Sequence, residues 1–419
     1  MGAILTQISE IFFMLLKLFS AYFSGIALFG LLPGKPAERR EPEQRLKFAV
    51  LLPARNEESC IAAAVESILH QDYPPELADV YVIPNNCQDD TAGAALRAGA
   101  RVLNVSSQVH SKGAALREAA EQLLGSAEGY EAFCVFDADN EADEHFLSAM
   151  NRCLCTQARI AKSRIFSKNA GQSWVCACYE IYFCLANVFL NRARARLGLS
   201  ARVIGTGFAI RRDLLTELGG FPAETITEDA ELWTLCAIRG EKIAFCPEAV
   251  TYDEEPLSFR TSLVQRRRWM SGIMQVCGLR LRELLAALLH RKSSWKMAAI
   301  SAADVCIQLC FGYMQALLPG FLLLSWLAEP GAALAALSLS LATGWAVASG
   351  QALLVLLLQK RWRGYMWRGV LLYPLFIFSF VPLQSLALLR RTTVWREIPH
   401  TGVRQFAPEH KRRQLQEYV

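Results

Sequence analysis

Residues 48–58 read Phe-Ala-Val-Leu-Leu-Pro-Ala-Arg-Asn-Glu-Glu, so that an apolar run changes abruptly into a polar one. The apolar part has the length and character of a buried strand, and charged and amide side chains follow it directly. Further runs of this kind alternate with helical periods as far as about Pro256, which predicts a mostly parallel sheet with helices on both faces. These further runs lie at residues 80–84, 100–105 and 133–137.

The polar turns after these strands are candidates for a binding site, because ligands of open α/β sheets bind beyond the carboxyl ends of the strands. One turn, Asp137-Ala138-Asp139, follows an apolar run that is suited to a central strand. Two carboxylates at this spacing can hold one hard divalent cation against a diphosphate, although solvated loops often carry the same pair. The other two turns are residues 54–58 and residues 85–90.

The composition indicates one soluble domain joined to membrane segments. The 419 residues are 53% hydrophobic, and the mean hydropathy is +0.21. The net charge of +5 is modest, and the basic residues gather beside apolar stretches, as membrane-flanking charge does. This distribution predicts membrane lipids as partners and argues against a nucleic-acid-binding surface.

The thirteen cysteines are scattered through the expected strands and helices, and their number is odd. We therefore expect reduced, mostly buried thiols rather than a disulfide framework. Cys153-x-Cys155 and Cys176-x-Cys178 are spaced too closely for the usual zinc ligand pairs, and no histidine pair accompanies them. We expect no zinc site.

The first apolar stretch, residues 11–32, is 22 residues long and carries one charge, Lys17. It is too long for the core of a signal peptide and lacks a small-residue cleavage site, so we expect residues 1–34 to form a retained transmembrane helix. Positive charge follows this helix and none precedes Lys17, which places the N-terminus outside and the domain at residues 45–256 in the cytoplasm. We expect a multi-pass integral membrane protein of the plasma membrane.

The C-terminal part begins with a basic, amphipathic stretch at residues 257–290, which is too charged to span a bilayer. We expect interfacial amphipathic helices over residues 257–300 and a transmembrane region of two to three helices over residues 301–390. The apolar segments of that region are residues 305–327, 332–358 and 369–389.

The position of the basic tail, residues 391–419, depends on the number of crossings before it. Three crossings place the tail outside, whereas its positive charge favours the cytoplasm. We favour a cytoplasmic tail in which the third segment is not a full crossing, because Pro374, Pro382 and Gln384 interrupt it. Three complete helices with an external tail are the alternative.

Two further motifs lie close to the membrane segments. Thr227-Glu228-Asp229 offers a carboxylate that could act as a base, and Gln265-x-x-Arg268-Trp269 follows fewer than forty residues later. Asp229 could also be a carboxylate at the start of a helix capped by Thr227. Arg268 and Trp269 could equally anchor the chain at the level of the lipid head groups.

Taken in order along the chain, these pieces resemble the membrane-bound family 2 glycosyltransferases, which include the synthases of cellulose, chitin, hyaluronan and poly-N-acetylglucosamine. The resemblance covers nearly the whole chain and implies an α/β GT-A fold, a Rossmann-like nucleotide-sugar domain. It implies an inverting transfer of a hexose or N-acetylhexosamine from a UDP-sugar to a growing glycan at the cytoplasmic face. The matching pieces are residues 53–58, the Asn86 and Asp90 turn, Lys112-Gly113, Asp137-Ala138-Asp139, Gly205-Thr206-Gly207, Thr227-Glu228-Asp229 and Gln265-x-x-Arg268-Trp269.

The resemblance also implies roles at the matching positions. Asp229, with Glu228 beside it, would be the catalytic base, and Arg268 would assist the departing diphosphate. Asp139, helped by Asp137, would bind Mg²⁺ or Mn²⁺. The nucleotide would be bound by Pro53, Ala54, Arg55, Asn56, Glu57, Asn85, Asn86, Asp90, Lys112 and Asp137, and the acceptor by Gly205, Thr206, Gly207, Gln265 and Trp269.

The chemistry of the assignment is reasonable on its own terms. Displacing a nucleoside diphosphate from an anomeric carbon needs positive charge on the leaving group and a carboxylate that takes the proton of the incoming hydroxyl. One departure from the family pattern is Asn85, where many relatives carry Asp. Because one charge of the nucleotide site is lost, UDP is the nucleotide that we favour rather than one that the residues require. The run at residues 394–401 resembles, more loosely, a segment that closes over the nucleotide in some relatives.

Three functions are compatible with these residues. Transfer to a growing glycan is the leading one, and transfer of a single sugar to a lipid acceptor is the second, because three apolar segments are few for a translocation channel. A non-catalytic membrane scaffold is the third, although a scaffold has no need of Asp137, Asp139, Asp229 and Arg268 together. The sequence names neither the sugar nor the acceptor.

Overall fold

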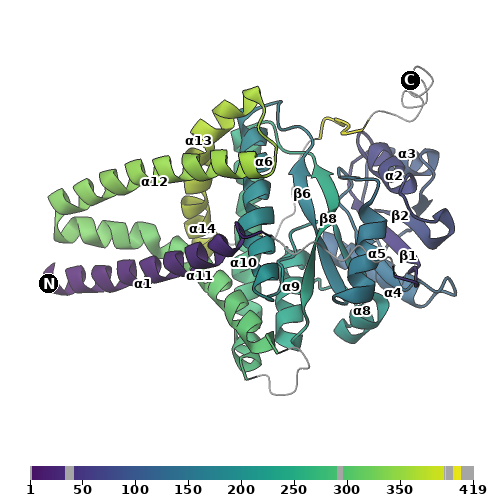
Figure 1. Cartoon of the computed structure of the whole chain (residues 1–419), viewed down its shortest axis with the longest axis horizontal. Coiled ribbons are helices and arrows are strands. Elements are labelled where there is room, and N and C mark those ends of the chain that lie inside the picture. The colour runs from purple at the N-terminus through teal and green to yellow at the C-terminus, as the bar shows by residue number, and fades with distance from the viewer. Residues whose placement is uncertain (1, 34–41, 290–295, 391, 393–399, 407–419) are drawn as a thin grey trace.

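The computed structural model of the chain describes residues 2–33, 42–289, 296–390, 392 and 400–406. An α/β unit lies to one side of it and long helices project from the other side (Figure 1). Within the described residues eight strands form one sheet, in the order β3-β2-β1-β4-β7-β6-β8-β5. Their bounds are β1 Phe48–Ala54, β2 Ala78–Pro84, β3 Arg101–Val102, β4 Ala132–Val135, β5 Glu141–Ala142, β6 Ile160–Ser167, β7 Phe208–Arg211 and β8 Ile243–Asp253.

The sheet is mixed, and the parallel pairing expected from the sequence holds for four of its seven strand pairs. β3, β2, β1 and β4 run parallel to one another, whereas β7 is antiparallel to both β4 and β6. The sequence pattern could not reveal this reversal, because a central strand that is buried on both faces is a continuous apolar run in either direction.

Helices cover both faces of the sheet because successive side chains of a strand point to opposite sides. Val50 of β1 packs into the core on one face, beneath α2, α3 and α5. Leu51 packs into the core on the other face, with α4, α8, α9 and the first turns of α11. The bounds are α2 Ile61–Leu69, α3 Thr91–Arg97, α4 Lys112–Leu124, α5 Phe146–Thr156, α8 Arg212–Leu218 and α9 Glu228–Arg239, with a 3-10 turn η1 at Pro75–Leu77.

A long buried helix joins the sheet to the helical part. It consists of α6, Trp174–Leu185, a π-helical stretch η2, Ala186–Arg192, and α7, Ala193–Arg196. By length and composition this helix is apolar enough to cross a membrane, but 67% of its most apolar stretch is buried inside the molecule. Its hydrophobicity therefore reflects packing between the sheet and the other helices.

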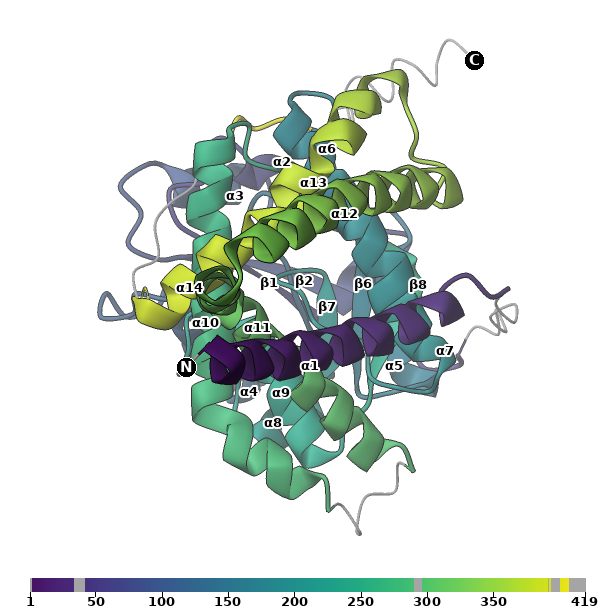
Figure 2. The same cartoon turned by 90° about the vertical axis from the view of Figure 1, so that its left-hand side faces the viewer.

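Three helices project together away from the sheet (Figure 1), and Figure 2 shows them from the side to which they project. They are α1, Gly2–Phe29, α11, Ala298–Ala328, and α12, Pro330–Leu358. Each is long and apolar enough to cross a membrane, and each exposes leucines, such as Leu18, Leu323 and Leu339. An apolar surface of this kind is suited to lipid.

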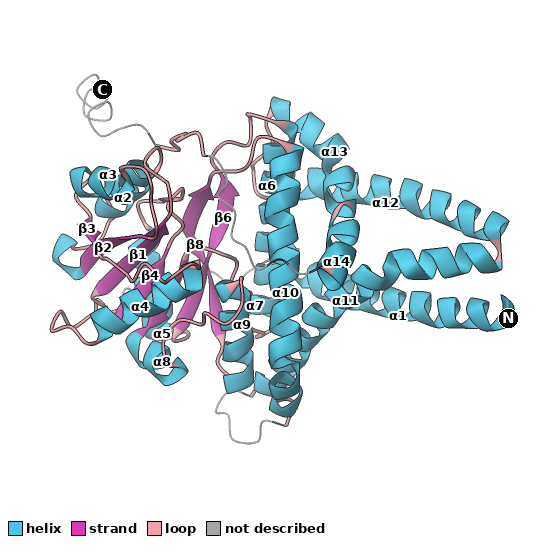
Figure 3. Cartoon of the chain, turned by 180° about the vertical axis from the view of Figure 1, so that it is seen from behind, coloured by secondary structure: helices cyan, strands magenta, loops and turns pink. Residues whose placement is uncertain are grey.

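The last apolar segment is broken and lies across the base of the projecting helices (Figure 1). It forms α13, Trp367–Phe378, and α14, Phe380–Leu389, after a 3-10 turn η3 at Gly364–Met366. At the break the buried Arg266 donates hydrogen bonds to the Phe376 carbonyl at 2.7 Å and to Ser379 Oγ at 2.8 Å. Arg266 belongs to α10, Phe259–Ala287, which stands between the sheet and the projecting helices (Figure 3).

A buried ion pair fastens the projecting helices to the α/β unit. Arg194 of α7 donates to both carboxylate oxygens of Asp304 of α11, at 2.8 and 2.9 Å. The hydroxyl of Tyr22 of α1 donates to the same carboxylate at 2.7 Å. One carboxylate thus connects three helices that are far apart in the sequence.

Candidate active site

A cavity of about 380 Å³ begins beyond the carboxyl ends of β1 and β4 and continues between α6, α10, α11 and α14. Its sheet-side half is rich in charged groups, and its membrane-side half is lined mainly by apolar and aromatic side chains. Fifteen of the residues singled out from the sequence line it. They are Pro53, Ala54, Arg55, Glu57, Asn85, Lys112, Asp137, Asp139, Gly205, Thr206, Glu228, Asp229, Gln265, Arg268 and Trp269.

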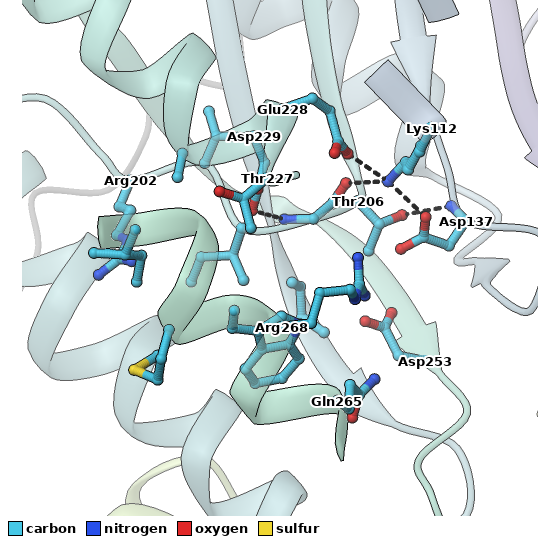
Figure 4. A pocket seen from close by; sticks show the side chains of 18 of the residues that line it. Lys112, Asp137, Arg202, Thr206, Thr227, Glu228, Asp229, Asp253, Gln265 and Arg268 are labelled. Atoms are coloured by element: carbon cyan, nitrogen blue, oxygen red, sulfur yellow. Dashed lines mark hydrogen bonds and ion pairs between the residues drawn. The ribbon is translucent and has the colours of Figure 1, made fainter. Parts of the chain in front are cut away.

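Asp229 lies in the first turn of α9, and its side chain is directed into this cavity (Figure 4). The backbone N–H of Gly205 donates to Asp229 Oδ2 at 2.7 Å, which fixes the carboxylate and leaves Oδ1 available. Gly205 has φ +53°, a conformation that favours glycine. Thr227 precedes the helix as expected, but its side chain makes no capping hydrogen bond.

Lys112 begins α4 and joins the two acidic motifs. Its Nζ lies 2.6 Å from Asp137 Oδ1 and 3.0 Å from Glu228 Oε1, and it donates to the Gly205 carbonyl at 2.8 Å. Burial alone would lower the pKa of Lys112, but Asp137 and Glu228 outweigh it and the pKa is raised. The cavity therefore holds a permanent ammonium beside the Asp-x-Asp turn, and Asp137 is engaged with it.

Asp139 faces a second cluster of charged groups. His400 Nδ1 lies 3.6 Å from Asp139 Oδ2, and His400 Nε2 lies 3.9 Å from Glu57 Oε1. Burial raises the pKa of Asp139, and burial likewise raises the pKa of Glu57 to about 7. The pKa of His400 would fall with burial, but the carboxylates Asp139 and Glu57 raise it.

The residues around Asp139 fit a bound divalent cation. Oδ1 of the neighbouring Asp253 is buried with no hydrogen-bond partner, and burial and Asp139 raise the pKa of Asp253 far above its usual value. Excess buried negative charge of this kind is relieved by a metal ion. Among the described residues no three side chains that could coordinate a metal ion are already gathered. Asp139 and His400 would therefore share the ion with oxygen atoms of the bound nucleotide sugar.

The residues after His400 lie against the α/β unit. The Thr401 hydroxyl donates to Glu254 Oε1 at 2.7 Å, and the backbone N–H groups of Gln405 and Phe406 donate to Glu141 at 2.8 and 3.1 Å. Lys168 lies 3.5 Å from each of these two glutamates. Residues 400–406, which we call the tail strap, thus pack against the α/β unit and place His400 in the lining of the sheet-side half. Residues 391, 393–399 and 407–419 of the tail lie outside the described residues.

Aromatic side chains line the passage from Asp229 toward the membrane helices. The ring of Trp269 lies parallel to that of Tyr182, 6.3 Å away at 25°, and edge-on to that of Tyr179 at 6.1 Å. The Tyr179 hydroxyl donates to Gln265 Oε1 at 2.6 Å, which holds this glutamine in place. Arg268 of α10 also lines the cavity, and its side chain lies on the side of Asp137 and Asp253 (Figure 4).

Four residues singled out from the sequence do not line the cavity. Asn56 and Asn86 have φ +57° and +53° and shape the turns after β1 and β2. Asp90 is exposed and pairs with Arg97 at 2.8 Å. Gly207 directly precedes β7, and a Cβ there would overlap Ser163 Oγ. The structure brings none of these four side chains into the cavity lining.

Several lining residues carried no signal in the sequence. Arg202, Trp233 and Asp253 belong to no motif, and Gln308 and Gln315 lie within apolar segments where a lone amide is easily overlooked. Gln384 also lines the cavity, but the sequence marks it only as an interruption of an apolar segment, and His400 lies in the run that resembles a closing segment. A polar side chain inside an otherwise apolar membrane segment is the signal that could have identified the glutamines.

Comparison with known proteins agrees with this geometry. The chain is 25% identical over 244 residues to the probable glycosyltransferase YdaM of Bacillus subtilis, which covers 57% of each chain. It is 26% identical over 262 residues to the beta-monoglucosyldiacylglycerol synthase of Trichormus variabilis, covering 59% of this chain and 54% of that one. The chain spans little more than half the length of these two relatives.

A third relative is the cellulose synthase catalytic subunit of Pseudomonas fluorescens, 25% identical over 251 residues, which are 57% of this chain and 32% of that one. Among solved structures, the mannosyltransferase PcManGT of Pyrobaculum calidifontis shares the fold, with a TM-score of 0.59 and 18% identity over 90% of this chain and 98% of that one. Residues 44–272, more than half of the chain, match the family described as Glycosyltransferase like family 2. The expected GT-A fold is confirmed, and the chain belongs to glycosyltransferase family 2.

Proposed function

We propose that this protein transfers a hexose or N-acetylhexosamine from a UDP-sugar, with inversion at the anomeric carbon, to a hydroxyl of an acceptor at the membrane. The observation that carries the proposal is the placement of Asp229 in one cavity with Lys112 on one side and the Asp139 and His400 pair on the other. In this proposal a base and a diphosphate site face each other across the cavity, which would hold the sugar.

The sheet-side half is the proposed donor site. Pro53 to Glu57 and Asn85 would hold the base and ribose, and the amide of Asn85 can both donate and accept hydrogen bonds. Lys112 and Arg268 would lie against the diphosphate, where positive charge stabilises the leaving group. PcManGT was solved with GDP-mannose and Mn²⁺, so GDP-sugars belong in any donor test beside UDP-sugars.

A divalent cation, Mg²⁺ or Mn²⁺, would be held by Asp139 and His400. The orphaned Oδ1 of Asp253 and the raised pKa of Asp139 support this assignment. When bound, the ion neutralises charge on the departing diphosphate. Asp137 would act through its pair with Lys112.

The reaction follows from the position of Asp229. The acceptor oxygen attacks the anomeric carbon while the bond from that carbon to the diphosphate oxygen breaks, and the diphosphate leaves with the electron pair. Oδ1 of Asp229 takes the hydroxyl proton, because Oδ2 already accepts from Gly205. A single displacement of this kind inverts the anomeric centre.

The membrane-side half is the proposed acceptor site, and a lipid-linked acceptor fits its walls best. The side chains there, among them Met270, Ile273 and Phe380, come from helices that also border the membrane helices. A growing glycan is the second candidate, because Gln308 and Gln384 present buried amide oxygens that lack partners among the described residues. Sugar hydroxyls would satisfy such oxygens. The catalytic site would face the cytoplasm at the plasma membrane.

The test is turnover of purified protein with a panel of labelled UDP- and GDP-sugars, with and without Mg²⁺ or Mn²⁺. We expect metal-dependent transfer from a UDP-sugar. One lipid-linked product supports a lipid acceptor, whereas a ladder of lengths supports a growing glycan. Absence of transfer from every donor, with folded protein and several membrane extracts as acceptor source, would refute the proposal.

A further inference from the structure

The membrane-side half of the cavity contains one guanidinium that the proposed reaction does not use. Arg202 lies in the loop before Gly205 and lines the cavity together with Trp233 (Figure 4). Its guanidinium carbon lies 5.0 Å from the centre of the Trp233 ring, which stacks the cation on an aromatic face. Arg268, by contrast, lies toward the donor half of the cavity (Figure 4).

Arg202 has no ion pair with a carboxylate in the part of the chain that the structure describes. Three other arginines near the junction with the membrane helices are paired with carboxylates: Arg194 with Asp304, Arg280 with Glu231 and Arg361 with Glu180. Arg266 is instead held by the Phe376 carbonyl and Ser379. Because no carboxylate lies within ion-pair distance, the guanidinium of Arg202 is available to an anion that enters the cavity.

The backbone of Arg202 is held in place by a residue of the π-helical stretch. Its N–H donates to Asn191 Oδ1 at 2.9 Å, and Asn191 Nδ2 donates back to the Arg202 carbonyl at 3.3 Å. Asn191 is buried, and the preceding Ala201 is joined to Ile243 of β8 at 2.9 Å. π-helical turns often occur at functional sites, and this one positions the arginine.

We propose that Arg202 binds the phosphate of a lipid acceptor, so that the acceptor is a phosphate-bearing lipid with a hydroxyl in its head group. This inference rests on the proposed function and specifies its acceptor. A guanidinium matches a phosphate in charge and geometry, and the neighbouring Leu190, Phe183 and Met270 are suited to hydrocarbon.

The spacing within α9 supports a short head group. Trp233, beneath Arg202, follows Asp229 by four residues, which is about one helical turn or ~6 Å along the axis. A phosphate on Arg202 therefore places a hydroxyl a few bonds away beside Asp229. That hydroxyl oxygen forms the bond to the anomeric carbon and passes its proton to Asp229, while the phosphate ester itself stays intact and the nucleoside diphosphate leaves.

The experiment compares acceptors of defined chemistry with purified full-length protein in detergent. The acceptors are dioleoylglycerol, dioleoylphosphatidylglycerol and a prenyl diphosphate sugar, tested with wild type, Arg202→Gln, Arg202→Lys and Arg363→Gln. Arg363 is an exposed cation outside the cavity and serves as the matched control. Acceptor KM, donor KM and lipid retention in native mass spectrometry are measured.

We expect a phosphate-bearing acceptor to be preferred at least tenfold over dioleoylglycerol. Arg202→Gln should raise the KM for that acceptor about tenfold and weaken its retention equally, with donor KM unchanged, while Arg202→Lys restores part of the loss. Comparing turnover of dioleoylphosphatidylglycerol with turnover of the prenyl diphosphate sugar shows which class of lipid carries the phosphate. Equal use of dioleoylglycerol, or lipid retention in Arg202→Gln equal to that in Arg363→Gln, overturns the inference and leaves the proposed glycosyl transfer standing. If the wild-type protein transferred sugar from no donor to any of these acceptors, the proposed function itself would be overturned.

Discussion

Asp229 is the residue on which the proposed chemistry depends most directly. Replacing it by asparagine keeps the shape of the side chain and removes its ability to accept a proton. We expect Asp229→Asn to lower kcat about 10³-fold, within the range usual for a general base, with donor affinity little changed. Steady-state kinetics and nucleotide binding by calorimetry measure the two effects.

Asp213→Asn is the control for Asp229→Asn, since Asp213 is an exposed carboxylate on α8 and does not line the cavity. It should leave kcat within twofold of wild type. Unchanged sugar transfer by Asp229→Asn would remove the base assignment and favour the scaffold function.

The Asp139 and His400 pair yields a prediction about metal. Chelation with EDTA should abolish transfer, and added Mn²⁺ or Mg²⁺ should restore it. His400→Ala should raise the metal concentration needed for half-maximal rate by about 10- to 100-fold or more, because even residues that only orient metal ligands contribute on this scale. His145→Ala, at an exposed histidine, is the control. Full activity in EDTA, or equal metal dependence of the two variants, would contradict the assignment.

At the scale of elements, the contact between α10 and the start of α9 decides where the base lies. A Cβ on Gly272 of α10 would overlap the side chain of Thr227, two residues before Asp229. Gly272→Ala should therefore push the base loop away and lower kcat about 100-fold, since a displacement of ~1 Å has that effect. Activity and thermal unfolding are measured together.

Gly320→Ala provides the comparison for Gly272→Ala. Gly320 is also a helical glycine, in α11, but a Cβ there meets nothing within 4 Å. It should leave kcat unchanged. If both variants were fully active, the close approach of α10 would have no part in placing Asp229.

The ion pair between α7 and α11 yields a prediction about stability. Arg194→Met leaves the Asp304 carboxylate buried without its guanidinium, and we expect a loss of about 3–5 kcal/mol. Thermal unfolding in detergent measures it. The double variant Arg194→Met, Asp304→Leu should recover much of the loss, because no charge is then left unpaired. A single variant as stable as wild type would show that the pair does not hold these helices.

At the scale of the whole molecule, the arrangement of helices yields a prediction about topology. The helices α1, α11 and α12 project together, and the tail strap contacts the α/β unit, so we expect the tail strap and the α/β unit to lie on one side of the membrane. Epitope tags in the exposed loop at Gly129 and at the C-terminus should be accessible from the cytoplasmic face of sealed vesicles, and an N-terminal tag from the other face. A C-terminal tag on the side opposite the Gly129 tag would refute this topology.

The fold was largely predictable from the sequence, because runs such as Phe48 to Pro53 followed by polar turns reflect a buried strand and its exposed end. The direction of β7 was not, since burial on both faces removes the alternation that could report it. Buried α6 also escapes such reasoning, because a helix packed inside protein is as apolar as one packed in lipid.

The site was predictable where a motif marks it. Asp229 and Arg268 line the cavity, as do Lys112 and Asp139. Arg202 and Asp253 belong to no motif, and their contribution depends on which loops the fold brings together. Asn86 and Asp90 show the converse, since a motif residue can act on a site by shaping a turn without entering the cavity.

The tail strap has a consequence for biosynthesis. Residues 400–406 follow α11, α12, α13 and α14 in the chain, yet they bind to Glu141 and Glu254 of the α/β unit and bring His400 into the proposed donor site. A ribosome therefore finishes the sheet, Asp229 and Asp139 long before the strap that completes the site. Until the tail strap packs against the α/β unit, the proposed donor site of a nascent chain lacks His400, and we therefore expect no sugar transfer before membrane insertion is complete.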